Sequence, residues 1–289
     1  MDVSIIIVNY NTEKLIIDCI NSIYEKTKDV TFEVIVVDNA SKNDTSRLKY
    51  DKRIIYIESK NNLGFGGANN LGVKYAKGEY LFFLNPDTLL INNAIYILYN
   101  YLQNNPDVGI CGGNLYDMNK NPAHSYRIIA PGILSEIYTL VSGIPFKYFL
   151  HEDFNPTSSP IRVAYVTGAD LLIRASVFKK VGGFDKQFFM YFEETYLCKE
   201  VSKLQYKIYN IPQAQIIHYE GKSFEWKQQR EEMYFDSRKK YITLKCGKLS
   251  YHICNFIYAI TCSTRILYFT LMRNKKKKKY WTYKLKQLL

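Results

Sequence analysis

Apolar and polar residues alternate along the first part of the chain in blocks that predict strands and helices in turn. Residues 3–8 form a nearly continuous apolar run rich in β-branched side chains, which is typical of a strand buried on both faces. Residues 14–24 follow with apolar side chains at helical spacing. The same reasoning predicts strands at residues 33–37, 54–58, 80–84 and 108–111, and helices at residues 67–77 and 93–103. This alternation predicts a doubly wound, mostly parallel α/β sheet with helices on both faces.

The pattern weakens between residues 114 and 161, where five prolines and an amphipathic stretch at residues 133–150 predict an insertion over the sheet edge. Regular elements return as strands at residues 163–168 and 214–217 and as helices at residues 175–181 and after Glu194. We therefore expect one large domain, residues 1–247, followed by a C-terminal appendage, residues 248–289.

Polar residues follow four of the predicted strands directly. They are Asn9 and Asn11 after the first strand, Asp38 after the second, Asn62 after the third, and Asn85 and Asp87 after the fourth. Each segment alone is also an ordinary turn, because Asn, Asp, Gly and Pro dominate turns. Ligands of doubly wound sheets bind beyond the carboxyl ends of the strands, so four such segments on one rim predict a binding site.

Asp87 and His218 are candidates for holding a divalent cation. Asp87 follows Pro86, and a carboxylate on a proline-stiffened turn is suited to hold a hard cation against phosphate oxygens. The alternative is that Asp87 caps a helix. His218 ends the predicted strand at residues 214–217 and could supply an imidazole to the same cation, although a lone histidine is usually structural.

Glu193 and Glu194 directly follow the aromatic run at residues 188–192. An apolar setting disfavours the charged form of a carboxyl group, which raises its pKa toward that of a useful general base. The alternative is an acidic first turn of a helix.

A glycine-rich segment at residues 64–67 also precedes a predicted helix. It lacks the third glycine of a dinucleotide fingerprint, because Asn69 stands there, and it follows the third strand instead of the first. Its backbone N–H groups could still face a diphosphate or a sugar hydroxyl.

The net charge of +12 indicates an anionic partner. The densest basic run, residues 273–279, follows an apolar stretch at residues 251–272 that polar residues interrupt, which favours a helix lying on an anionic membrane surface over a spanning helix. Nucleic acid is disfavoured as the partner, because basic residues would then be expected along a folded face or interleaved with stacking aromatics. The alternative for the tail is a last core helix with a solvated end. The acidic start of the chain predicts no signal peptide, and hence a cytoplasmic protein at the inner face of the plasma membrane.

Taken together, these segments resemble family 2 glycosyltransferases, within them the bacterial rhamnosyltransferase-like group. The matching segments lie at residues 3–11, 36–41, 62–66, 70–72, 84–88, 167–169, 182–185 and 192–194. The resemblance implies a GT-A fold, with a nucleotide-binding half at residues 1–112 and an acceptor-binding half at residues 113–247. It also implies inverting transfer of a sugar, with rhamnose leading, from a dTDP- or UDP-linked donor to a glycan or lipid-linked glycan acceptor of the cell surface.

The resemblance further implies roles for single residues. Asp38 would contact the base, Asp87 and His218 would bind Mn²⁺ or Mg²⁺, and Glu194 would be the catalytic base. The donor site would comprise Asn9, Asn11, Asp38, Asn62, Gly64, Asn70, Asn85 and Asp87, and the acceptor site Glu193 and Gly168. Tyr196 departs from the pattern, because relatives commonly carry an acid there, which leaves open a weakly active or purely sugar-nucleotide-binding protein. A nucleotidyltransferase is disfavoured, because its basic phosphate loop would follow the first strand. The oligomeric state stays open.

Overall fold

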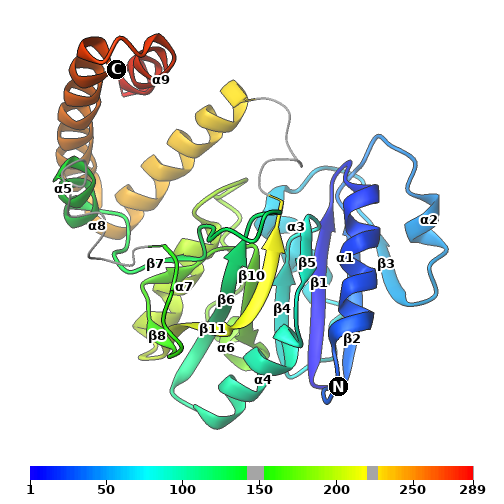
Figure 1. Ribbon diagram of the computed structural model, residues 1–289. Coiled ribbons are helices and arrows are strands. Elements are labelled where there is room, and N and C mark those ends of the chain that lie inside the picture. The colour runs from blue at the N-terminus through cyan, green and yellow to red at the C-terminus, as the bar shows by residue number, and fades with distance from the viewer. Residues whose placement is uncertain (142–152, 220–226, 289) are drawn as a thin grey trace. The chain divides into compact units, whose positions relative to one another are not determined.

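The computed structural model describes residues 1–141, 153–219 and 227–288 (Figure 1). The chain forms two compact units, which we call the sheet unit (residues 1–128 and 152–227) and the helical unit (residues 129–151 and 228–289). The domain boundary expected at residue 247 stays a prediction. Gly247 lies within the long helix α8 (Lys227–Leu271), where its φ of +86° interrupts the helical backbone.

One large mixed sheet organises the sheet unit. Its strand order is β3 (Ile54–Glu58), β2 (Phe32–Asp38), β1 (Val3–Asn9), β4 (Tyr80–Leu84), β10 (Asp170–Arg174), β6 (Val108–Tyr116), β11 (Lys207–His218) and β5 (Thr88–Leu90), with β8 (Ile161–Arg162) beside β11. The first four strands are parallel to one another, as are β6 and β11, whereas β10 runs antiparallel to both of its neighbours. The prediction of a mostly parallel α/β sheet is thereby confirmed.

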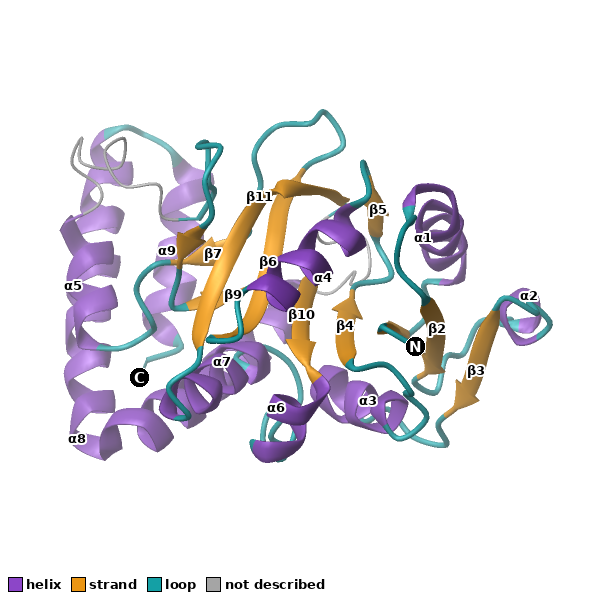
Figure 2. Ribbon diagram, turned by 90° about the horizontal axis from the view of Figure 1, so that it is seen from below, coloured by secondary structure: helices purple, strands orange, loops and turns teal. Residues whose placement is uncertain are grey.

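Helices cover both faces of this sheet (Figure 2). On one face, α1 (Glu13–Lys26) and α4 (Ala94–Asn104) pack against alternate strand residues such as Ile5 and Ile7. On the other face, α3 (Gly64–Val73), α6 (Ala175–Lys180) and α7 (Glu193–Lys203) pack against the intervening residues such as Ile6. A strand buried on both faces is therefore mostly apolar, and β1 is apolar except for the buried Ser4 and Asn9. The remaining elements of the sheet unit are α2 (Ser46–Lys49) and the small sheet of β7 (Tyr126–Arg127) and β9 (Tyr165–Val166).

The strand expected at residues 163–168 is wrong. Only β9 falls there, and the strand that joins the central sheet is β10, which begins and ends with charged residues. Partners on other strands and on α4 bond these side chains: the fully buried Asp170 accepts a hydrogen bond from the Gly113 N–H at 2.6 Å, and Arg174 donates to the carbonyls of Val108 and Leu102 and the hydroxyl of Tyr80. Burial raises the pKa of Asp170 well above its usual range.

The helical unit consists of α5 (Ile133–Val141), α8 and α9 (Lys275–Lys286). The rest of the amphipathic stretch expected at residues 133–150 lies outside the described residues. Two partly or fully buried ion pairs join its helices. Arg238 of α8 contacts Glu136 of α5 at 2.6 Å, and Lys284 of α9 contacts Glu231 of α8 at 2.7 Å. Among the described residues, no helix combines the length and the apolar character needed to cross a membrane.

Candidate active site

The first two strands bring three of the predicted donor-site residues together at their carboxyl ends. In the parallel register, Asn9 lies opposite Asp38, and the Asn9 amide donates to Asp38 Oδ1 at 2.8 Å. Asp38 is 4% exposed. Asn11 adopts a left-handed backbone, with φ of +59°, and its N–H donates to the Ser41 hydroxyl at 3.0 Å. A left-handed asparagine costs less than most residues, because its short polar side chain bonds locally. The result is an ordered rim at the ends of β1 and β2.

A side-chain network joins this rim to the glycine-rich turn. The Asn39 amide donates to Asn62 Oδ1 at 2.9 Å, and Asn39 Oδ1 accepts from the Leu63 N–H at 2.8 Å. Asn62 Oδ1 also accepts from the Gly64 N–H at 2.9 Å. Asn39 was not among the predicted site residues, although its place directly after Asp38 was the signal that could have identified it. The turn that opens α3 is therefore fixed to the end of β2.

Asp87 and His218 meet at the far side of the same rim. His218 ends β11 and pairs with Thr88 of β5, so that its Nε2 lies 3.4 Å from Asp87 Oδ1 and 3.3 Å from the Asn85 amide nitrogen. Asp87 is 2% exposed. Asp87 Oδ1 and His218 Nδ1 are both buried without a hydrogen-bond partner. The unsatisfied Asp87 Oδ1 is thus held beside His218 Nε2, whereas the unpartnered nitrogen of the imidazole is Nδ1.

These two side chains fit a divalent cation. Ligands about 2.1 Å from one ion and at right angles to each other lie about 3 Å apart. The observed distance between His218 Nε2 and Asp87 Oδ1 is close to this, at 3.4 Å. Within the described parts of the chain, no three His, Cys, Asp or Glu side chains gather into a metal site. A cation held here would therefore take its remaining ligands from elsewhere, such as phosphate oxygens or water.

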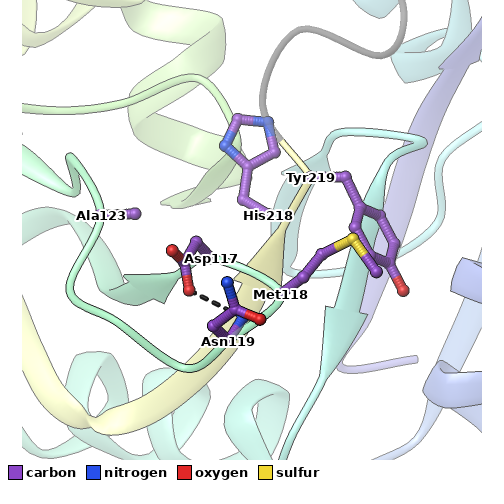
Figure 3. A pocket seen from close by; sticks show the side chains of 6 residues that line it. All are labelled: Asp117, Met118, Asn119, Ala123, His218 and Tyr219. Carbon is purple, nitrogen blue, oxygen red and sulfur yellow. Dashed lines mark hydrogen bonds between the residues drawn. The ribbon is translucent and has the colours of Figure 1, made fainter.

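His218 also lines a cavity that the sequence did not indicate (Figure 3). The cavity has a volume of about 210 Å³, and its other lining residues are Asp117, Met118, Asn119, Ala123 and Tyr219. The turn at residues 117–121 is ordered by Asp117, whose carboxylate accepts from the Asn119 and Asn121 N–H groups, both at 2.8 Å.

Glu193 and Glu194 begin α7 at the edge of the glycine-rich turn. Glu193 is buried, and its Oε2 has no hydrogen-bond partner. Glu194 is half-buried beside Gly168, where a Cβ atom would lie 3.7 Å from the Glu194 Cβ. Burial raises the pKa of Glu194, and burial together with the neighbouring charge of Glu194 raises the pKa of Glu193 further. Both carboxyl groups therefore hold a proton to a higher pH than an exposed glutamate does.

The side chains of Asn70 and Tyr196 contact other residues of the protein. Asn70 donates its amide to the Phe184 carbonyl at 2.8 Å and accepts from the Phe184 N–H at 3.0 Å. The Tyr196 ring lies 5.4 Å from the Phe188 ring, and the Lys199 ammonium lies 4.9 Å from the Tyr196 ring centre. The ligand-binding roles of all the predicted residues stay predictions.

Comparisons with known proteins agree with one another. The family model described as glycosyl transferase family 2 matches residues 4–182. The chain is 29% identical over 234 residues to the low-salt glycan biosynthesis hexosyltransferase Agl10 of Haloferax volcanii, covering 75% of this chain and 66% of that protein. It is 28% identical over 246 residues to the rhamnosyltransferase WbbL of Escherichia coli, covering 78% of this chain and 89% of that protein. The chain spans about half the length of several other curated relatives that it matches.

The fold also resembles solved structures. GalNAc-T7, solved with UDP, GalNAc and Mn²⁺, superposes with a TM-score of 0.58 at 14% identity, over 75% of this chain and 44% of that one. At this identity the likeness concerns the fold, which is of the GT-A type.

Proposed function

The chain belongs to glycosyl transferase family 2, and from this premise we propose that it is an inverting enzyme. It moves a sugar from a nucleotide-diphosphate donor to a hydroxyl group of a lipid-linked or polysaccharide acceptor in bacterial cell-surface glycan synthesis. The observation that carries this proposal is the half-buried Glu194, which stands at the rim of the sheet next to Gly168 and the glycine-rich turn.

Glu194 acts as the general base. Its raised pKa favours proton uptake from the acceptor hydroxyl, which then attacks the anomeric carbon on the side opposite the diphosphate. Burial also raises the pKa of Glu193, which in its protonated form can donate a hydrogen bond to the acceptor. Gly168 lets the Phe65 ring approach beside Glu194, because a Cβ atom on Gly168 would lie 3.3 Å from that ring. No covalent enzyme intermediate is required.

Donor binding uses residues at the strand ends of the same rim. Asp38 contacts the base, and Asn9, Asn11 and Asn62 order the segments around it, as their hydrogen bonds support. Asp87 and His218, with Asn85 beside them, hold Mn²⁺ or Mg²⁺. When bound, the cation neutralises the charge that develops on the leaving diphosphate.

Rhamnose from dTDP-rhamnose is the leading donor, and UDP-linked sugars are the alternative. The relative WbbL is a rhamnosyltransferase, and Agl10 is a hexosyltransferase. Tyr196 packs against Phe188, so the acid that relatives commonly carry at this position is replaced by a ring contact within the protein. We infer that this exchange alters the preference for the sugar or the acceptor.

Replacement of Glu194 by Gln tests the assignment. Loss of a general base lowers kcat by about 100-fold or more, while binding of the donor nucleotide stays unchanged. The matched control is Glu200→Gln on the same helix, which removes a carboxylate that pairs with Lys203 at 2.9 Å and keeps near-normal turnover. Rates are measured with Mn²⁺ and Mg²⁺ across a panel of nucleotide sugars. Near-normal turnover in Glu194→Gln contradicts the base assignment, and binding of the panel without transfer identifies a binding protein instead.

We propose that the helical unit attaches the protein to the inner face of the plasma membrane. The second half of α8 carries exposed apolar side chains three, four or seven residues apart, hence along one side of the helix. They are Leu249 (74% exposed), Ile253, Phe256 (69%), Ile260, Leu267 and Leu271 (73%). Exposed lysines at residues 275–279 follow directly. An apolar stripe next to a cationic run suits an anionic lipid surface, where each lysine contributes about 1 kcal/mol.

Vesicle sedimentation tests this attachment. The full chain should sediment with phosphatidylserine-containing vesicles at low salt and much less with phosphatidylcholine alone. The double variant Phe256→Ser and Leu267→Ser should lose this binding. Tyr50→Ser, which removes a side chain that is 79% exposed on the sheet unit, should keep it. Unchanged sedimentation of the double variant rules the stripe out, and a smaller oligomer in that variant assigns the stripe to contacts between copies of the chain.

A further inference from the structure

The backbone directly before the two glutamates is strained. Tyr191 and Phe192 have φ angles of +69° and +67°, so two successive residues with side chains adopt the left-handed conformation. This conformation costs free energy for any residue except glycine, and it persists only where surrounding contacts enforce it. Glu193 and Glu194 follow immediately as the first turn of α7. The direction of both carboxylates therefore depends on whatever holds this segment.

The opening of α3 provides one of these contacts. The Phe65 N–H donates to the Phe189 carbonyl at 2.9 Å. Gly64 passes so close that an added Cβ atom would lie 2.1 Å from the same carbonyl oxygen, and a Cβ atom on Gly66 would lie 3.5 Å from the Glu193 Cβ. The turn fixed to the end of β2 thus contacts the segment that leads into α7.

Asn70 provides a second contact from the same helix. Its amide bonds both the N–H and the carbonyl of Phe184, four residues before Phe188. Phe184 is 2% exposed, and its ring packs against Phe65 and Phe83 at centroid distances of 6.0 and 4.8 Å. The two hydrogen bonds therefore hold the start of the loop at residues 184–192, while Phe65 holds its end.

We propose that Asn70 is a positioning residue for the catalytic base, which it holds in place through the loop at residues 184–192, and that it is not a ligand of the donor. This inference rests on the proposed function, because it concerns the base Glu194. The sequence had suggested that Asn70 belongs to the donor site, and the proposal replaces that role. The amide already serves as donor and acceptor to one backbone unit, and replacement by a side chain without both groups frees the loop.

Hydrogen exchange and kinetics of Asn70→Ala test the proposal. Exchange in peptides that cover residues 182–192 should rise, kcat should fall at least tenfold, and the dissociation constants of UDP and dTDP with Mn²⁺ should stay within twofold. The acid limb of the pH–rate profile should also move to lower pH, because a loosened loop exposes Glu194. Asn104→Ala is the matched control, since its amide bonds only Asn100 within its own helix. If the alanine variant does not fold, Asn70→Asp replaces it in the same measurements. It keeps the acceptor for the Phe184 N–H and loses the donor to the Phe184 carbonyl.

Two results overturn the proposal: unchanged exchange in the loop, or nucleotide affinity that weakens by the same factor as kcat. The second result makes Asn70 a donor ligand. Failure of the proposed function looks different, because the wild-type chain would then transfer no sugar while the exchange experiment still reports on the loop.

Discussion

Gly64→Ala tests the close approach between α3 and the segment before α7. Gly64 has a φ of +72°, and an added Cβ atom would lie 2.1 Å from the Phe189 carbonyl oxygen. A left-handed alanine costs about 1–2 kcal/mol. Relief of the overlap separates the Phe65 N–H from its acceptor, and an unsatisfied buried N–H costs about 1–3 kcal/mol more. We therefore expect a total loss of about 2–5 kcal/mol of unfolding free energy.

Gly182→Ala is the control, because Gly182 has a φ of +80° but an added Cβ atom would meet no atom within 4 Å. It should lose only the conformational cost of about 1–2 kcal/mol. The two variants then differ by the cost of the lost hydrogen bond, about 1–3 kcal/mol. At roughly 2–4 °C per kcal/mol for a unit of this size, calorimetry should find the Gly64 variant melting about 2–12 °C below the Gly182 variant. Equal losses in the two variants would refute the contact between Gly64 and Phe189.

Two further changes probe buried ionisable groups, one in each unit. Burial raises the pKa of Asp170 above its ordinary value of 3.8, so the folded state keeps a proton that the unfolded chain releases, and stability is lost as pH rises toward the folded pKa. Asp170→Asn should therefore gain in urea midpoint relative to the wild type between about pH 4 and pH 8, and parallel pH curves would contradict this. Lys284→Ala should lose its ion pair with Glu231 and its contacts with the rings of Tyr234, Phe235 and Tyr280. A cost of about 2 kcal/mol and faster hydrogen exchange in α9 are expected, against no change in the exposed control Lys275→Ala.

Continuous apolar runs predicted the parallel strands closely. The strands expected at residues 54–58 and 80–84 match β3 and β4. β4 is buried and apolar throughout, whereas the edge strand β3 is mostly half-buried and ends in the exposed Glu58. The same pattern missed β10, since the partners that bond Asp170 and Arg174 lie 57 and 66 residues away in sequence. The helix expected at residues 67–77 runs from Gly64 to Val73 instead, because the glycines of the turn themselves form its first residues.

From the rule that ligands bind at strand ends, the sequence predicted which residues form the rim of the candidate site. Asn9 and Asp38 lie in contact, as do Asp87 and His218. The directions of the side chains could not be predicted from the sequence. Nothing local indicated that the Asn70 amide would bond Phe184, 114 residues later, or that Phe65 and Phe189 would meet. The contribution of α5 to the helical unit was also missed, because the Glu136 and Arg238 partners are 102 residues apart.

The charges in the first turn of α9 destabilise that turn. Lys275 to Lys279 are five successive exposed lysines that follow the Asn274 cap, where the partial positive charge of the helix dipole already resides. Like charges three and four residues apart repel each other on a helix, so this turn is weakest in dilute salt. An anion that binds here offsets both the unfavourable helix dipole and the repulsion between the lysines. It stabilises the folded turn, and because binding and folding are linked, it binds the folded turn more tightly than the unfolded one. Folding of this end of the chain and its recognition of negative charge are therefore one linked equilibrium.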